Sequence, residues 1–552
     1  MNRRWTCFWL VCCSVFLAYL PDLRNGLLAW DDAGYILENS NIHSFSLATV
    51  HWAFTSFYLN YWAPLTWLSL AFDYSLWGGN PVGYHLVNNI LHALSAGTFF
   101  LICHRLMMVY DGALPKGSRG RFSVLNPLWC AALAALLFAI HPLRVESVAW
   151  ATERKDVLSL FFGLMAILFY LRYACGCGSL QARWPQNNNV LLRDYSLSLL
   201  FFTFSLCSKS LLVTLPVVLL VLDWFPLKRI ASSGIRAIVL EKVPFFLLAA
   251  AVALLTMAAQ ANAIEPIDGQ TRVLNAFASI AAYLRLTAWP SGISPFYVHP
   301  FNIPGMTWAY FLPIALFIVI TASCMQLTKR LPVVMACWLI YLVTLLPFLG
   351  LTQQVGAQAM AGRFTYLAGL PLALLFSLGI NALFASFGAS RAARIAFLAA
   401  MAVLVLTNAY LTVREIAFWK DDVTLWTRVI ELSPSTGRAY FQRSHAYYLQ
   451  HNYQRSLADL DKAITIAASK QYRAMHELYQ KRGIIHGDMG DLVTAVEDYT
   501  KALETAKADK RSEILYARGS AYQKMGRDDL ANGDFRLSRM AIKETGGGNG
   551  SL

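Results

Sequence analysis

The first three quarters of the chain alternate between long apolar runs and short polar links. Each apolar run is long enough to cross, or nearly cross, the hydrocarbon core of a bilayer. The pattern therefore predicts a polytopic membrane domain of about eleven helical spans. The expected spans are 5–21, 84–104, 127–140, 157–173, 195–207, 210–224, 243–261, 306–327, 332–349, 366–386 and 395–413.

One further stretch, 273–289, is apolar enough to be a twelfth span, although Arg272, Asn275 and Arg285 interrupt it. If it crosses, later basic residues such as Lys329 and Arg330 lie on the outer, non-cytoplasmic side of the membrane. If it is an interfacial helix within one outer loop, 262–305, they lie on the cytoplasmic side. The excess of Lys and Arg on cytoplasmic loops favours the interfacial helix. We therefore expect eleven spans, with the C-terminal region on the same side as the first loop.

The first loop, 22–82, is long and rich in aromatic residues. Aromatic side chains favour the boundary between membrane and water, so we expect part of this loop to lie on the bilayer. The residues concerned include Phe54, Phe57, Tyr58, Tyr61, Trp62 and Trp67.

The polar C-terminal region carries an internal repeat. When Ser444, Gly483 and Gly519 are placed in register, similar residue types recur at fixed offsets. Tyr447, His486 and Tyr522 follow three residues later, His451, Gly490 and Gly526 seven later, Leu460, Tyr499 and Phe535 sixteen later, and Ala463, Ala502 and Ser538 nineteen later. The pattern is typical of tetratricopeptide helix pairs, whose repeat is about 34 residues. Solenoids of this type bind peptides or proteins; a plain helical spacer is the alternative.

These patterns give three parts: a membrane domain over 1–413, a repeat domain over 414–545 and a flexible tail over 546–552. The predicted fold class is all-α, a transmembrane helix bundle followed by an α-solenoid. We expect the N-terminal span to be an uncleaved signal anchor with its N-terminus in the cytoplasm.

Composition agrees with a membrane protein. Hydrophobic residues make up 57% of the chain and charged residues only 14%. The net charge of +14 comes largely from short loops, as the positive-inside rule expects, and does not indicate nucleic-acid binding. All ten Cys lie within or beside apolar segments, which excludes a disulfide framework or a zinc site at the usual ligand spacing.

The candidate chemistry begins at Trp30-Asp31-Asp32-Ala33-Gly34-Tyr35, where two carboxylates follow the first span. Ionisable groups at a membrane surface are costly unless they have a function. The spacing of acids and aromatic residue resembles the first-loop motif of membrane glycosyltransferases of the GT-C class. A solvated loop with two acids is the other interpretation.

Further blocks extend the resemblance over nearly the whole chain. They are Tyr61 to Ser69, His85 to Asn88 with His92, His141-Pro142 through Glu146 to Trp150, Glu153 to Leu158, Lys209 before Val213 to Pro216, Trp289-Pro290, and Gln354 to Met360 with Arg363 and Tyr366. Together they resemble the bacterial branch of the transmembrane and tetratricopeptide-repeat family, whose animal members are protein O-mannosyltransferases.

The resemblance implies a GT-C fold and transfer of a sugar, mannose or another hexose, from a polyprenyl-phosphate carrier. The chain departs from the family pattern at three positions. Gly362 stands where an acid usually precedes Arg363, Ala368 replaces a Pro, and Ser210 replaces a Pro after Lys209. These departures set the expected donor site apart from that of the family and can change which sugar it binds.

Sugar transfer from a lipid phosphate needs a base for the acceptor hydroxyl, and we expect Asp31 in that role with Asp32 orienting the acceptor. It also needs positive charge at the leaving phosphate. The candidates are Arg154, Lys155, Lys209 and Arg363. Pairing of these cations with Glu153 and Asp156 is the alternative interpretation.

Substrate hydroxyls need polar partners near the span ends. The candidates for holding the sugar or the acceptor are His85, His92, His141 and Glu146. The residue types would also permit a divalent ion held by His141, Glu146 and one of the two Asp residues, but the spacing is weak, and we predict no metal and no cofactor.

Three functions remain in competition. The first is a transferase that moves the sugar to a protein or glycan, with the repeats presenting the acceptor at the periplasmic face of a bacterial inner membrane. The second is an O-antigen ligase or polymerase, but loop 262–305 holds only Arg272, Arg285 and His299 of the residue types that such enzymes use there. The third is a membrane-anchored repeat scaffold without catalysis.

Overall fold

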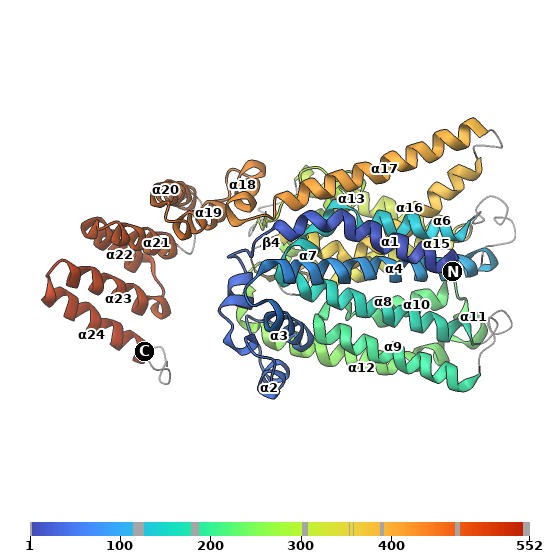
Figure 1. Cartoon of the computed structure of the whole chain (residues 1–552), viewed down its shortest axis with the longest axis horizontal. Helices are drawn as coiled ribbons and strands as arrows, with labels where there is room; N and C mark the ends of the chain where they lie inside the picture. The colour runs from blue at the N-terminus through green and yellow to red at the C-terminus, as the bar shows by residue number, and fades with distance from the viewer. Residues whose placement is uncertain are drawn as a thin grey trace. The chain divides into compact units, whose positions relative to one another are not determined.

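The computed structural model describes residues 3–113, 126–177, 187–300, 307–352, 354–356, 358–386, 391–469 and 475–544. The chain forms two compact units, Met1–Asp421 and Asp422–Leu552 (Figure 1). The division falls eight residues after the predicted domain boundary, because the last long helix of the first unit, α17 (Arg391–Ala417), continues past residue 413. The predicted flexible tail, 546–552, lies outside the described residues.

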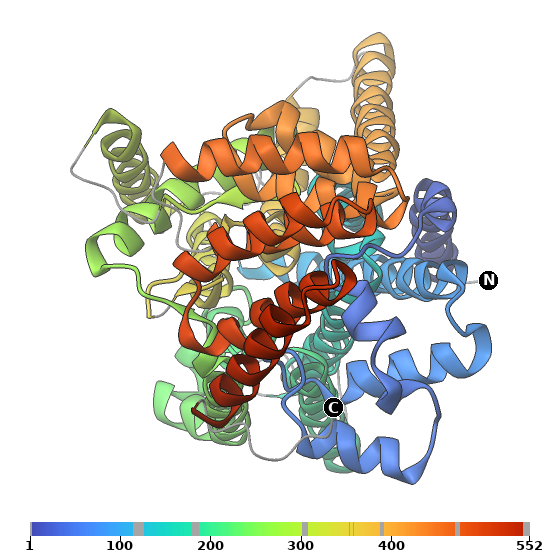
Figure 2. The same cartoon turned by 90° about the vertical axis from the view of Figure 1, so that its left-hand side faces the viewer.

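The first unit is a bundle of long helices that lie side by side (Figure 1), several of which are seen end-on in Figure 2. Among the described residues, eight helical stretches are long and apolar enough to cross a membrane. They include α1 (Arg3–Tyr19), α4 (Pro81–Ala113), α8 (Arg154–Cys175), α9 (Asn188–Ser208), α12 (Ile235–Gln260), α14 (Trp308–Leu327), α16 (Thr365–Ser386) and α17.

Three further apolar segments complete the bundle. The pair of Pro127–Ala139 and Pro142–Ala149 is bent by 58° and counts as a ninth candidate span. It contains α6 (Pro127–Ala139), η5 (Pro142–Arg144) and α7 (Val145–Ala149). The helices α10 (Leu215–Trp224) and α15 (Pro332–Leu345) are apolar but shorter. All eleven predicted apolar segments are therefore helical, and the all-α fold class is confirmed.

The ambiguous stretch forms α13 (Gly269–Ala288), which begins where the Asp268 carboxylate accepts a hydrogen bond from the amide of Thr271 at 2.9 Å. It is not among the described helices that are apolar enough to span. Its buried face, with Ile280, Tyr283 and Leu286, joins a core with α15 and α16. The loops on either side are held by short antiparallel pairs, β1 (Ile264–Glu265) with β3 (Gln354–Val355) and β2 (Tyr297–Val298) with β4 (Gln358–Met360).

The first loop folds into two helices, α2 (Leu47–Thr55) and α3 (Pro64–Trp77), which pack around Trp67 and Tyr35. Its outer surface carries exposed apolar side chains at Leu47, Phe54, Phe57, Phe72 and Leu76. The prediction that part of this loop lies on the bilayer remains a prediction.

The second unit is a set of helix pairs, as the repeat pattern predicted. After α18 (Asp422–Leu432) come the pairs α19 (Gly437–Leu449) with α20 (Tyr453–Ser469), α21 (Met475–Asp488) with α22 (Leu492–Thr505), and α23 (Ala508–Lys524) with α24 (Asp528–Glu544).

Two features of this unit follow the predicted register. The residues aligned seven positions after the small residue, His451, Gly490 and Gly526, all have positive φ and turn the chain between the helices of a pair. Gly483 lets the two helices approach, because a Cβ there would lie 2.8 Å from the Tyr499 ring.

Candidate functional site

Four of the candidate site residues, Glu146, Lys155, Lys209 and Arg363, are joined by ion pairs at the end of the membrane bundle at which α7 and β4 lie in Figure 1. Between α6 and α8 the chain makes three short helical turns, η5, α7 and η6 (Ala151–Glu153), instead of one continuous span. The break lies at His141-Pro142, just after α6 ends at Ala139, because a proline cannot continue the hydrogen bonding of the preceding helix. It brings the polar side chains of residues 146–156 together at the end of an otherwise apolar bundle.

Glu153 is the central carboxylate of this cluster, and its side chain is buried. Its Oε1 lies 3.2 Å from the Lys155 Nζ and 3.4 Å from the Arg363 Nε, while its Oε2 lies 3.2 Å from the Lys209 Nζ. One carboxylate therefore links three cations that come from three separate segments of the chain.

Two further carboxylates, Asp156 and Glu146, balance the remaining positive charge of the three cations. The Asp156 Oδ1 lies 2.5 Å from the Lys209 Nζ, and its other oxygen accepts a hydrogen bond from the Ser147 hydroxyl at 3.1 Å. Glu146 pairs with the Arg363 guanidinium and accepts a bond from the Arg363 amide at 3.2 Å. Burial lowers the pKa of Lys209, but the charges of Asp156 and Glu153 outweigh it and raise that pKa above its usual value. Lys209 therefore stays cationic at neutral pH.

Aromatic rings surround the same cations. The Lys155 Nζ lies 4.8 Å from the ring centre of Tyr35, 5.2 Å from that of Tyr61 and 5.8 Å from that of Trp150. The Arg363 Cζ lies 5.5 Å from the Trp150 ring. Such contacts stabilise a desolvated cation by about 2 kcal/mol or more.

The two adjacent acids of the first loop have different surroundings. Asp32 is fully buried, and its carboxylate accepts bonds from the amides of Leu28 at 2.8 Å and Thr152 at 3.0 Å. Burial raises the pKa of Asp32 to about 6. The side chain thus fastens the first loop to the turn that carries Glu153, and it holds the loop in place without reaching the charged cluster.

Asp31 is only partly buried, and its charge acts on Tyr35, whose ring contacts Lys155. The pKa of Tyr35 is raised first by burial and then by the negative charges of Tyr61, Asp31 and Glu153, and it is lowered by Arg363. Asp31 and the cluster therefore act on the same ring. Of the two acids, Asp31 is the more exposed, and it remains the predicted base.

Arg154 does not join the other three predicted phosphate ligands. It is fully buried, and its guanidinium contacts Asp73 at 2.7 Å, Asn88 at 2.6 Å, Ser69 at 2.7 Å and the Tyr84 carbonyl at 3.0 Å. These contacts tie α8 to α3 and α4. The structure thus places Arg154, predicted to bind the donor phosphate, apart from Lys155, because neighbouring residues on a helix point in directions about 100° apart.

The three predicted histidine ligands also lie apart from the charged cluster. His85 pairs with buried Asp22 at 3.5 Å. His92 bonds the Tyr366 hydroxyl at 2.6 Å and the Ala139 carbonyl at 3.0 Å. The His141 Nδ1 accepts a bond from the Leu143 amide at 3.2 Å, so its Nε2 donates to the Thr287 carbonyl at 3.1 Å. Their contacts are structural, and only Glu146 of this group joins the cluster.

Gly362, where the resemblance leads one to expect an acid, lies directly against Glu146. A Cβ at this position would lie 2.8 Å from the Glu146 Oε2. The carboxylate that pairs with Arg363 therefore comes from α7, and glycine leaves the room for it.

The structure shows the alternative interpretation for two of the cations, because Lys155 pairs with Glu153, and Lys209 pairs with Glu153 and Asp156. Sequence reasoning missed the ring of Trp150. The signal for the ion pairs was present in Glu153-Arg154-Lys155-Asp156, four charged residues in a row at the start of an apolar helix. Within the described residues, no group of three or more His, Cys, Asp or Glu side chains is arranged to hold a metal ion.

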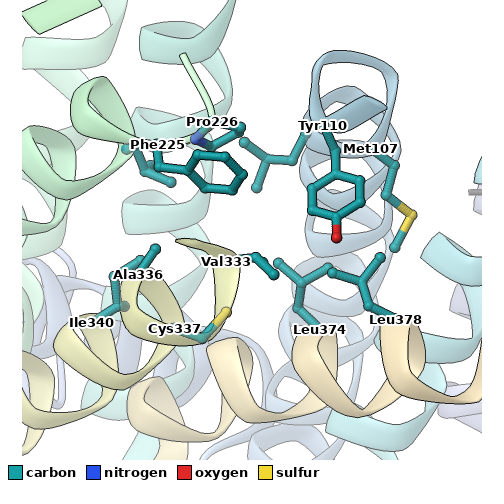
Figure 3. Close-up of a pocket in the computed structure, with 12 residues that line it drawn as sticks. Met107, Tyr110, Phe225, Pro226, Val333, Ala336, Cys337, Ile340, Leu374 and Leu378 are labelled. Atoms are coloured by element: carbon teal, nitrogen blue, oxygen red, sulfur yellow. The ribbon is translucent and has the colours of Figure 1, made fainter. Parts of the chain in front are cut away.

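Two apolar cavities lie within the bundle. The first has a volume of about 40 Å³, and the second about 70 Å³. Figure 3 shows the first, where Tyr110, Phe225 and Pro226 face residues of α15 and α16 across the cavity. The two cavities share five lining residues, Leu106, Leu222, Cys337, Ile340 and Leu374, so they are adjoining parts of one cleft.

Comparison with known proteins finds relatives named protein O-mannosyl-transferases. The chain is 30% identical over 183 residues to protein O-mannosyl-transferase Tmtc3 of Drosophila melanogaster, a match that covers 30% of this chain and 19% of that protein. It is 32% identical over 181 residues to human protein O-mannosyl-transferase TMTC4, covering 30% of this chain and 23% of that protein. The chain thus matches about a fifth of the length of these relatives. No family model matches the chain.

Among solved structures, the crystal structure of MamA is similar at 18% identity and a TM-score of 0.21, covering 26% of this chain and 74% of that one. The eight described helices that are long and apolar enough to cross a membrane are those expected of an integral membrane protein.

Proposed function

We propose that the protein transfers a hexose, mannose in the first instance, from a polyprenyl-phosphate carrier to a hydroxyl of a protein acceptor. The observation that carries the proposal is the joining of Lys155, Lys209 and Arg363 through Glu153 at the end of an apolar bundle, next to Tyr35, on which the charge of Asp31 acts. The similarity to proteins named protein O-mannosyl-transferases supports the reaction class.

In this proposal Asp31 takes the proton of the acceptor hydroxyl as that oxygen attacks the anomeric carbon of the sugar. The bond from the anomeric carbon to the phosphate oxygen breaks, and the lipid phosphate leaves with the electron pair. A carboxylate is a competent base at neutral pH when it is positioned by its surroundings. Asp32 holds the loop that carries Asp31.

The leaving phosphate would be stabilised by Lys155 and Lys209, with Arg363 beside them. An ammonium group has three N–H donors. One contact of Lys155, with Glu153, and two of Lys209, with Glu153 and Asp156, are directed to carboxylates. The remaining donors would bind phosphate oxygens. The carboxylates of Glu146, Glu153 and Asp156 compensate the positive charge of the buried cations. Arg154 has no part in this step.

Sugar binding would fall to Glu146 and the aromatic rings around Lys155. We infer no role for a metal ion or a cofactor, because the reaction needs only a base and a cationic site for the leaving group.

We place the site at the outer, periplasmic face of a bacterial inner membrane, as the resemblance to the bacterial branch implies. The distribution of charge supports this orientation. Arg3 and Arg4 begin α1, and Lys228, Lys329 and Arg330 lie in links at the bundle end opposite the site, where cytoplasmic basic residues are expected. In this orientation the first loop and the repeats are periplasmic, and the repeats present the acceptor.

The test is transfer of mannose to protein by the purified chain in lipid vesicles supplied with polyprenyl-phosphate mannose. We expect Asp31→Asn to lower the transfer rate at least 100-fold without weakening binding of the bare lipid phosphate. Glu38→Gln, a change at an exposed acid of the same loop, is the matched control. Undiminished transfer by Asp31→Asn would exclude Asp31 as the base.

A second measurement tests the compartment. Cysteines placed near Asn41 in the first loop and Gly547 in the tail are labelled from outside with an impermeant reagent. Labelling of both is expected. A tail that reacts only after the membrane is opened would show that the repeats lie in the cytoplasm and recruit partners there.

A further inference from the structure

We propose that the Tyr35 hydroxyl and the Trp150 indole N–H are two neutral hydrogen-bond donors for the phosphate oxygens of the lipid substrate. The inference rests on the proposed function for the identity of the phosphate. It deepens that function, because it gives the phosphate two uncharged ligands besides the three cations.

Both polar groups are buried and lack a hydrogen-bond partner among the described residues. Tyr35 is 2% exposed and Trp150 is 1% exposed, and neither the Tyr35 hydroxyl nor the Trp150 Nε1 has a partner. Each is the only polar atom of its side chain, so no second contact makes up for the missing bond. A buried donor without a partner destabilises a protein, and such groups are rare in native structures. Two of them in one place indicate that a ligand supplies the acceptors.

The two donors lie against the same cation. The Lys155 Nζ is 4.8 Å from the ring centre of Tyr35 and 5.8 Å from that of Trp150. The Arg363 Cζ is 5.5 Å from the Trp150 ring. Glu153 pairs with both cations, so the donors adjoin the part of the cluster proposed to bind the phosphate. A phosphate bound by Lys155 would therefore lie beside both rings.

Packing fixes both rings. The Tyr35 ring centre lies 4.8 Å from that of Trp67, and Trp150 stacks on Trp30 with ring centres 4.7 Å apart. A rotation that brought either polar atom to an acceptor within the protein would break these contacts. The donors are thus held in advance for a ligand, which lowers the entropic cost of binding.

The charge of the cluster explains the use of uncharged donors. Its three cations are balanced by three carboxylates, and the ion pairs join Lys155, Lys209 and Arg363 to Glu146, Glu153 and Asp156. Each cation therefore directs part of its hydrogen bonding to the protein. Neutral donors add hydrogen bonds to the phosphate without adding another buried charge, whose desolvation would be costly.

Tyr35 stays a donor at neutral pH. Burial raises the pKa of its hydroxyl first, and nearby negative charges, including those of Asp31 and Glu153, raise that pKa further. The hydroxyl therefore keeps its proton, and the indole N–H of Trp150 can only donate. Both groups suit a negatively charged acceptor.

The first test separates a contact with a ligand from a contact within the protein by two measurements on the purified full chain. Tyr35→Phe removes the hydroxyl and keeps the ring beside Lys155. We expect the Kd for bare undecaprenyl phosphate to rise at least tenfold, because a hydrogen bond to a charged acceptor is worth about that much. The midpoint of thermal unfolding without the lipid should not fall, because no bond within the protein is lost.

Tyr84→Phe is the matched control. Tyr84 is a buried tyrosine of the same aromatic core, and its hydroxyl donates to the Gly78 carbonyl at 2.7 Å. This variant should lower the midpoint and bind the lipid phosphate within about twofold of the unaltered chain. The proposal is overturned if Tyr35→Phe also binds within about twofold. It is overturned as well if Tyr35→Phe lowers the midpoint as much as Tyr84→Phe does, since the hydroxyl would then have a partner in the protein.

The second test removes only the N–H of Trp150. Benzothienylalanine, in which a sulfur atom takes the place of the indole N–H, retains the shape that stacks on Trp30. Its incorporation at position 150 is expected to weaken the binding of undecaprenyl phosphate at least fivefold. The same replacement at Trp308, an exposed position of α14, is the control. Equal affinity of the two proteins would overturn the proposal for Trp150.

Neither test needs sugar transfer, so a failure of the proposed function is seen separately. Weaker binding by both altered proteins, in a chain that transfers no sugar, would support the two donors and reject the transferase. Inorganic phosphate is the second probe, because its oxygens offer the same acceptors. A loss of affinity for inorganic phosphate alone would assign the donors to a soluble phosphate and overturn the proposal, as would absence of lipid-phosphate binding by the unaltered chain.

Discussion

The indole of Trp30 stacks on the indole of Trp150, with ring centres 4.7 Å apart and planes inclined by 27°. Trp30 immediately precedes Asp31, and Trp150 lies three residues before Glu153 in the turn that enters α8. The stack therefore fixes the first loop, which carries the proposed base, against the segment that carries the charged cluster. Trp419, at the end of the membrane unit, lies against Trp150 with ring centres 5.7 Å apart.

Removal of this stack should impair catalysis more than folding. Trp30 is only partly buried, so Trp30→Ala should leave the fold intact while allowing Asp31 to move. We expect the kcat for sugar transfer to fall about tenfold, because a small misplacement of a reacting group carries such a cost. Trp30→Phe should restore most of the rate. Trp308→Ala, at an exposed position of α14, is the control, and equal rates in the two alanine variants would contradict the role of the stack.

Glu153 should be the most sensitive residue of the cluster for stability. Its carboxylate is shared by Lys155, Lys209 and Arg363. Glu153→Gln leaves these buried cations with less compensating charge, and breaking a buried pair costs about 3–5 kcal/mol. The variant should show a clear fall in the midpoint of thermal unfolding in detergent, compared with Glu38→Gln. A midpoint equal to that of the control would mean that Asp156 and Glu146 suffice.

The pH dependence of stability should reflect the raised pKa of Asp32. Burial raises the pKa of its carboxyl to about 6, above the ordinary value of 3.8, so the folded state binds the proton more tightly than the unfolded state. Stability should therefore increase as the pH falls from about 6 towards 4, and decrease as the pH rises through 6.

The measurement is the free energy of unfolding between pH 4 and pH 8 for the unaltered chain and for Asp32→Asn. The variant should lose this part of the pH dependence. It should also be less stable by about 1–3 kcal/mol near pH 5, because an amide offers one oxygen where two backbone amides need acceptors. Parallel profiles for the two proteins would refute the assignment.

Replacing Gly362 by Asp, the residue type that the family resemblance leads one to expect, should reduce transfer. The new Cβ would lie 2.8 Å from the Glu146 Oε2, and two carboxylates would then compete for Arg363. We expect at least a tenfold loss in kcat/KM, partly restored by adding Glu146→Gln. Full activity of the single variant would show that Glu146 moves aside without consequence.

A recurring ion pair should set the stability of the repeats. Arg443, Arg482 and Arg518 each contact an Asp sixteen residues later, and the Arg482 pair includes Asp498, which is buried. Arg482→Met leaves that carboxylate without its partner, at a cost of about 3 kcal/mol. Hydrogen exchange in α21 and α22 of the full chain should accelerate, whereas Arg438→Met, at an exposed position, should have no effect. Unchanged exchange in Arg482→Met would show that the pair is dispensable.

Neighbouring residues illustrate what the sequence leaves open. Asp31 and Asp32 are neighbours in a one-dimensional motif, yet one is partly exposed and the other is buried and accepts two backbone hydrogen bonds. Arg154 and Lys155 also have different partners, Asp73 and Glu153, because a single step along a helix turns the side chain by about 100°. The pairing of Glu153 with Arg363, 210 positions later, has no local signal at all.

The sequence by itself determined the apolar helices and the helix pairs of the repeats, because the bilayer and the packing within one repeat both impose local, periodic patterns. It also indicated the first-loop acids and most of the cations as chemistry-bearing residues. Only the tertiary structure decided which of them meet. Buried charges must find partners wherever the fold brings them, and those partners come from segments far apart in the chain.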